Sequence, residues 1–223
     1  MNSKQEPPLI MKPKFIKEIE SACTEMIDIR DEDKFEHVYI SDCRIEAQEA
    51  GCVSFEGVIF KNVYFRDIKM HSLELTDVRF ENCDLSNADF SGAIIHRTEF
   101  INCKLLGLNL SNATLQNTYM EQCNGQFALM QFVQMKKVLL EDSIFEKSNF
   151  QNSDFTKVQF KKCNLKSAQM SGTSLSGIDL SHSDVEGLGV RQEDLRGAIV
   201  SPMQAIDFSK LLGLVINTGG TLS

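Results

Sequence analysis

The sequence predicts an all-β solenoid of about eight four-sided coils that ends in a short α-helix. Three observations predict it: an apolar residue at every fifth position, cysteines spaced by multiples of 20, and helix start and stop signals near the C-terminus. A helix repeats its apolar face about every 3.6 residues and a strand every second residue, so neither explains a period of five. A fixed short period is the signature of a repeat architecture, in which each coil packs on its neighbours.

The period of five extends over residues 35–200. Of the 34 positions in this register, 33 are apolar, and Gly125 is the exception. A second register lies two residues earlier, over residues 38–198, and holds small or modest side chains, with Gln48 and Glu193 as its misfits. A five-residue unit with one large and one small inward side chain forms one side of a coil. The register has no insertion, which predicts coils without a long loop.

Five of the seven cysteines stand in the second register at spacings that are multiples of 20: Cys43, Cys83, Cys103, Cys123 and Cys163. Twenty residues are four units, so each coil has four sides and these cysteines form one interior column. The column could be a metal site or a set of small buried thiols. The thiols are favoured, because the short Cys-x-x-Cys pairs of zinc sites are missing. An odd number of cysteines also indicates a reducing, cytoplasmic compartment.

The chain divides into three parts. Residues 1–34 lie outside the regular repeat, and we expect a flexible segment over residues 1–13 followed by a cap on the open sheet edge of the solenoid. Residues 35–200 form the β-helix. Residues 201–223 form a C-terminal helix and tail.

The C-terminal helix has clear boundary signals. Ser201 can cap it, Pro202 suits its first position, and Gly213 ends it. Its apolar residues exceed what a cap over the last coil needs, so we expect a two-fold homodimer contact as well as a cap. The expected dimer residues are Met203, Ile206, Phe208, Leu211, Leu212, Leu214 and Val215.

Composition excludes several function classes. The net charge of −8 and the pI near 5.1 argue against direct binding of nucleic-acid backbones. No apolar run is long enough for a bilayer, and the N-terminus lacks a secretory apolar region. The four histidines are dispersed, and no catalytic-triad, metal-ligand or phosphate-loop spacing is present. We therefore expect a binding protein with no enzymatic activity, no cofactor and no metal.

Acidic residues gather on one side of the predicted coil, the side centred on positions 40, 60 and so on to 180. Its outward acids are Asp42, Glu81, Glu99, Glu121, Glu141, Asp142 and Asp179, and its bases are Lys61, Arg79, Lys161 and Lys162. We expect a binding face made by Glu81, Glu99, Glu121, Glu141 and Asp142. Regular carboxylates on a rod can complement the positive charge of a DNA-binding groove, as the phosphates of DNA do. The alternative is that these acids only make the face soluble.

The repeat resembles the pentapeptide-repeat family. Residues 83–92, Cys-Asp-Leu-Ser-Asn-Ala-Asp-Phe-Ser-Gly, show the unit: a small residue, Asp or Asn, Leu or Phe, and two polar residues. The resemblance covers about residues 35–200. It implies a right-handed quadrilateral β-helix with Phe or Leu stacked in its interior.

Two features resemble the Qnr-type branch, whose members protect bacterial type II topoisomerases from quinolones. One is the ending, residues 194–216, with a short helix and a Leu-Gly-aliphatic run; the other is residues 46–52, which we expect to disturb the repeat as a first loop does. The second, longer loop of that branch is missing at residues 124–127. The resemblance implies a partner that is DNA gyrase or topoisomerase IV. The alternative is a scaffolding module that binds another protein through a solenoid face.

Overall fold

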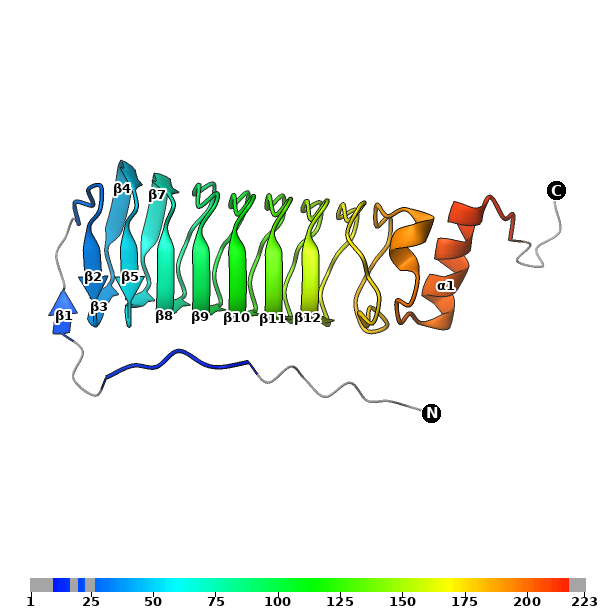
Figure 1. The fold of residues 1–223 in the computed structure, drawn as a ribbon, viewed down its shortest axis with the longest axis horizontal. Coiled ribbons are helices and arrows are strands. Elements are labelled where there is room, and N and C mark those ends of the chain that lie inside the picture. The colour runs from blue at the N-terminus through cyan, green and yellow to red at the C-terminus, as the bar shows by residue number, and fades with distance from the viewer. Residues whose placement is uncertain (1–9, 17–19, 23–26, 217–223) are drawn as a thin grey trace.

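The computed structural model describes residues 10–16, 20–22 and 27–216. The chain is a rod of stacked coils, with a helix at its C-terminal end (Figure 1). Every coil takes 20 residues, since Phe60 pairs with Phe80, which pairs in turn with Phe100. This register extends from Lys34 to Ile199, the length of about eight coils. The predicted four-sided, right-handed β-solenoid is confirmed.

All the strands pair in parallel. The main sheet has the order β1-β3-β6-β8-β9-β10-β11-β12, with β2 joined through β5 to β8, and β4 pairs with β7 in a second sheet. The remaining sides are held by isolated bridges at the same 20-residue spacing. The strands are β1 (Glu20–Ala22), β2 (Lys34–Glu36), β3 (Val38–Ser41), β4 (Arg44–Gly51), β5 (Ser54–Glu56), β6 (Ile59–Lys61), β7 (Tyr64–His71), β8 (Glu74–Glu81), β9 (Ile94–Ile101), β10 (Thr114–Glu121), β11 (Gln134–Glu141) and β12 (Asp154–Lys161).

The corners of the coils explain much of the polar sequence. From Phe35 to Leu175 the residue two places after each large inward residue takes a positive φ, as at Asn62 (55°), Asn82 (54°) and Asn102 (51°). Asn, Asp and Gly tolerate this left-handed conformation best, so the chain can turn every five residues. Phe127 and Phe132 stand at two such corners, with half of their surface exposed.

Both predicted inward registers are buried. From residue 40 to residue 190 the large register is buried at every position except the half-buried Phe155, and the small register is buried from residue 53 to residue 188. The rings of Phe80 and Phe100 stack with centroids 4.9 Å apart and an angle of 3° between their planes. Met120 continues the same row, as predicted. These stacked side chains are the core of the rod.

The misfits in the two registers have structural explanations. At Gly125 a β-carbon would collide with the ring of Phe145 from the next coil, so only glycine fits. Gln48 accepts a hydrogen bond from the backbone N–H of Ile29 and donates one to the carbonyl of Ile27. Gln48 therefore ties the N-terminal cap, in which both isoleucines are buried, onto the first coils.

The cysteine column is inert. The thiols of Cys83, Cys103, Cys123 and Cys163 donate to backbone carbonyls of their own or a neighbouring coil. Burial raises the pKa of the Cys163 thiol to about 12. Among the described residues no group of three or more His, Cys, Asp or Glu side chains could hold a metal ion.

The C-terminal end departs from the repeat at Glu193, as its misfit position indicates. The short helix η1 (Gln192–Leu195) exposes Glu193 and buries Asp194 instead. The helix α1 (Pro202–Ser209) starts at Ser201, whose side chain accepts from the N–H of Gln204, and η2 (Lys210–Leu212) ends at Gly213. The predicted helix boundaries are confirmed.

Two expectations about the first half of the chain need correction. Residues 46–52 do not disturb the repeat, because they lie within or directly after β4, which pairs in register with β7. Residues 10–13, expected to be flexible, belong instead to a segment of residues 10–16 that lies along the rod (Figure 1). Residues 1–9, also within the predicted flexible segment, fall outside the described residues. No helix within residues 10–16, 20–22 and 27–216 is long and apolar enough to cross a membrane.

Candidate protein-binding faces

Three of the predicted acids stand in one row along the rod. Glu81 and Glu121 both pair with Ile101 across β9, and Glu121 pairs with Glu141 on the next strand. Asp142 follows Glu141 at the corner of the coil, in a left-handed conformation. We call the surface made by Glu81, Glu121, Glu141 and Asp142 the acidic face. The positions of this row repeat at the strand spacing of about 4.8 Å, and Ile101 occupies the position between Glu81 and Glu121.

The centre of the acidic face holds two adjacent like charges. Glu121 and Glu141 are direct neighbours on paired strands, an arrangement that destabilises a sheet. The hydroxyl of Tyr119 donates to Oε2 of Glu141 at 3.1 Å. Burial, followed by this hydrogen bond and the charges of Glu141 and Glu121, raises the pKa of Tyr119. Glu121 has no cationic partner within 4 Å among the described residues, so the local potential is negative.

The other acids of the face pair with lysines one coil away. Nζ of Lys61 lies 2.8 Å from Glu81, whereas Nζ of Lys161 lies 3.6 Å from Glu141 and Nζ of Lys162 lies 3.6 Å from Asp142. All of these side chains keep contact with solvent, and exposed pairs contribute only about 0–1 kcal/mol. The lysines can therefore swing away when a stronger cation approaches.

Glu99 does not belong to the acidic face, which corrects the sequence prediction. Its register is outward, but it retains only 5% of its surface. Nε and Nη2 of Arg79 lie 2.8 and 2.7 Å from Oε2 of Glu99. Glu99 is shielded from water and paired with Arg79, so it is not available to a partner.

The N-terminal segment of residues 10–16 lies next to this side of the rod. The backbone N–H of Lys14 donates to Oδ1 of Asp77 at 2.9 Å, and that of Met11 lies 3.4 Å from Oδ1 of Asn117. The guanidinium of Arg79 sits 5.3 Å from the centre of the Phe15 ring, a cation–π contact. Sequence reasoning missed this segment, because the contacts join residues 63 and 106 positions apart.

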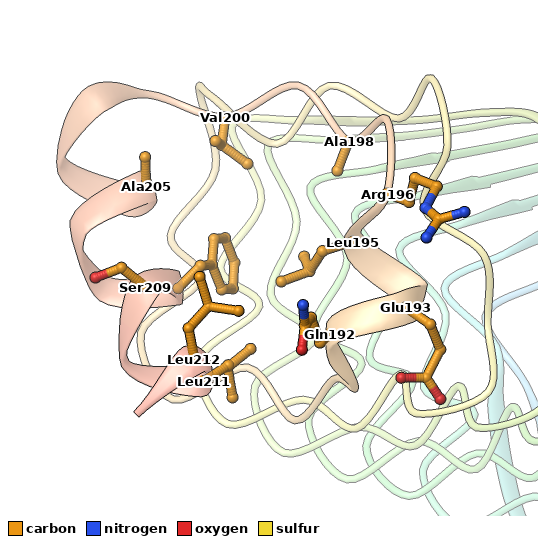
Figure 2. A pocket seen from close by; sticks show the side chains of 11 residues that line it. Gln192, Glu193, Leu195, Arg196, Ala198, Val200, Ala205, Ser209, Leu211 and Leu212 are labelled. Carbon is orange, nitrogen blue, oxygen red and sulfur yellow. The ribbon is translucent and has the colours of Figure 1, made fainter. Parts of the chain in front are cut away.

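A second candidate surface lies at the C-terminal end. A cavity of about 630 Å³ separates α1 and η2 from the last coil. Figure 2 shows Leu195, Leu211 and Leu212 around this opening. Most predicted dimer residues are exposed, from 41% at Ile206 to 96% at Val215, and the exposed set is Met203, Ile206, Leu211, Leu212, Leu214 and Val215. Phe208, which the sequence predicts as a dimer residue, is instead half-buried and packs against the core.

The pairing of acids with bases could have been found in the sequence. Each of the pairs Lys61–Glu81, Arg79–Glu99, Glu141–Lys161 and Asp142–Lys162 joins residues 20 positions apart. A period of 20 places such residues on neighbouring strands, so a search at that spacing finds every one of them. The burial of Glu99 has no such signal.

Comparisons with known proteins agree with the fold. The model of the pentapeptide repeat region matches residues 73–150, and the model of pentapeptide repeats in eight copies matches residues 143–181. No curated protein sequence matches the chain.

Several solved structures match this chain. HetL, a pentapeptide repeat protein involved in heterocyst differentiation regulation in the cyanobacterium Nostoc sp. strain PCC 7120, is 15% identical, with a TM-score of 0.57 over 76% of this chain and 90% of that chain. Full-length QnrB1, a plasmid-mediated fluoroquinolone resistance protein, is 17% identical, with a TM-score of 0.38 over 87% of this chain and 100% of that chain. A pentapeptide repeat protein of the Arabidopsis thaliana thylakoid lumen is 18% identical, with a TM-score of 0.31 over 57% of this chain and 75% of that chain. Identities this low concern the fold alone, and the family matches over residues 73–181 together with the 20-residue register show that this chain carries pentapeptide repeats.

Proposed function

We propose that the chain is a protein-binding solenoid whose acidic face docks into the DNA-binding groove of a bacterial type II topoisomerase, DNA gyrase or topoisomerase IV, in the cytoplasm. The protein itself performs no reaction. The carboxylates of this face take the place of phosphates against the Arg and Lys side chains of the groove.

The observation that supports this proposal most is the pair of adjacent carboxylates at Glu121 and Glu141. Placing like charges side by side on paired strands costs stability. The cost is offset when a cationic partner binds between or over them. The Qnr-like ending of the sequence selects a topoisomerase as that partner.

The test is to change three acids of the face to Lys and to measure binding to purified gyrase. Glu121, Glu141 and Asp142 all contact solvent, so the triple variant keeps the fold. We expect the unchanged chain to bind, to compete with DNA and to weaken steeply as salt rises, and the variant not to bind. Supercoiling assays with and without ciprofloxacin then separate inhibition from protection.

The matched control changes the same charge elsewhere. Glu36, Glu74 and Asp154 are exposed on the neighbouring side of the coil. Their replacement by Lys alters the net charge equally but leaves the acidic face intact, so binding is retained. If both triple variants lose binding alike, only the overall charge matters. If the unchanged chain does not bind gyrase or topoisomerase IV at low salt, the scaffold alternative replaces this proposal.

We also propose that two copies of the chain associate through their C-terminal ends. The exposed apolar side chains of α1 and of the residues that follow it, together with the cavity beside them, support a self-complementary contact. A two-fold dimer of rods matches a two-fold enzyme.

A further inference from the structure

The side of the rod next to the acidic face carries a docking surface for an extended peptide. Asp77 and Asn117 stand at equivalent corners two coils apart, a place where side chains are usually exposed, yet they retain 7% and 1% of their surface. Both accept from backbone N–H groups of residues 10–16. The surface therefore binds this segment through its main chain.

The path of the segment follows from the two hydrogen bonds. Met11 is held by β10 and Lys14 by β8, so three residues cross two strand spacings. Two spacings are about 9.6 Å, and three extended residues reach about 10 Å. The segment is thus nearly fully extended, as Figure 1 shows, and passes across β9, the strand that carries the buried Glu99.

The anchor at Asp77 is built for this contact. Arg97 donates to both carboxylate oxygens of Asp77, with Nε–Oδ1 and Nη2–Oδ2 distances of 2.6 Å. Burial alone would raise the pKa of Asp77, but the hydrogen bonds from Arg97 and from the Lys14 amide outweigh it and lower the pKa. The carboxylate is therefore fixed, charged and aimed at the Lys14 N–H.

The chemistry of the segment complements the acidic side. Lys12 and Lys14 extend into solvent, whereas Pro13 and Phe15 are half-buried toward the rod. Phe15 packs under Arg79, the residue that neutralises Glu99. The segment thus brings two positive charges and an aromatic ring to the same side that the partner's cations would use.

We propose that residues 10–16 are a tethered competitor that lies beside the acidic face, against Asp77, Arg79 and Asn117, and must leave before a basic partner docks there. This inference rests on the proposed function, since it assigns the regulation of the same face. The competitor is part of the chain, so its removal makes the face available without any change in the solenoid.

The experiment separates the amide of residue 14 from its side chain. In the full-length chain Lys14→Pro removes the N–H that donates to Asp77, whereas Lys14→Ala removes the same charge and keeps the N–H. Each variant is titrated with two probes, purified gyrase and a decalysine peptide. If the face is free about a tenth of the time, release tightens the binding of either probe about tenfold in the Pro variant relative to the Ala variant. Thermal unfolding followed by circular dichroism checks that the solenoid is unchanged.

A fluorescent reporter measures docking without any partner. The chain has no tryptophan, so Phe15→Trp introduces a single one beside Arg79. We expect a blue-shifted emission that moves to the red when Lys14→Pro is added and not when Lys14→Ala is added. Emission typical of exposed tryptophan in every variant would show that the segment does not dock.

The binding titrations decide whether the segment competes with a basic partner and which partner it competes with. Undocking in Lys14→Pro without tighter binding of either probe overturns the competition. Tighter binding of decalysine by Lys14→Pro, with no binding of gyrase by any variant, supports the competitor and rejects the topoisomerase as its partner.

Discussion

The stacked row of aromatic side chains in the core makes Phe100 the most sensitive position of the fold. Phe100 has no exposed surface and lies between Phe80, 4.9 Å away between ring centroids, and Met120 on the next coil. Phe80 also stacks on Phe60 at 4.8 Å, so it cannot move into a vacated space without losing that contact. Because the site cannot collapse, Phe100→Ala should cost about 4–5 kcal/mol, the upper part of the range for such changes.

The free energy of unfolding is measured by urea denaturation, followed by far-ultraviolet circular dichroism. The control is Phe132→Ala, the same chemical change at a corner where the ring is 53% exposed, and we expect a change within about 0.5 kcal/mol. Phe100→Glu, which buries an unpaired charge, should prevent folding. A cost below about 1 kcal/mol for Phe100→Ala, or a folded Phe100→Glu protein, would refute the inward register.

Two further predictions concern the C-terminal end. Oδ2 of Asp194 accepts from the N–H groups of Gly172 and Arg191, and the Arg191 hydrogen bonds lower its pKa to about 2. Since the pKa of Asp194 is depressed in the folded state, its contribution to the free energy of unfolding is present above about pH 4 and is lost as the pH falls toward 2. Asp194→Asn should therefore cost about 2 kcal/mol at pH 7 and almost nothing at pH 2, as measured by urea denaturation at each pH. A penalty independent of pH would contradict this. For assembly, Leu212→Glu combined with Val215→Glu should convert a dimer into a monomer in analytical ultracentrifugation, and an unchanged chain that is already monomeric at micromolar concentration would reject the dimer.

Most of the fold could be predicted because the repeat maps sequence position directly onto coil position. The register alone gives the four sides, the stacked row at Phe80 and Phe100, and the cysteine column. Gln48 could be recognised as a misfit, but its partners Ile27 and Ile29 lie in an irregular segment without a period. The need for glycine at position 125 could not be predicted, because it depends on the ring of Phe145 one coil away.

The candidate site could be predicted only in part. The outward register places Glu81, Glu121 and Glu141 correctly, because it depends on period alone. Glu99 pairs with Arg79, which in turn contacts Phe15 of a segment that folds back from the N-terminus. No local sequence pattern predicts that the N-terminal segment lies along the rod, since its hydrogen bonds are made by backbone groups that almost every residue carries.

Site-specific photo-crosslinking tests most directly whether the acidic face is the surface that binds a topoisomerase. Gln122 and Asn152 are both exposed, left-handed corner residues; Gln122 adjoins Glu121, and Asn152 belongs to the diagonally opposite corner of the coil. A photoreactive phenylalanine analogue at either position leaves the core untouched. We expect that the analogue at position 122 crosslinks to gyrase, that DNA prevents the crosslink, and that the analogue at position 152 does not crosslink. Equal crosslinking from both positions, or crosslinking from position 152 alone, would contradict it.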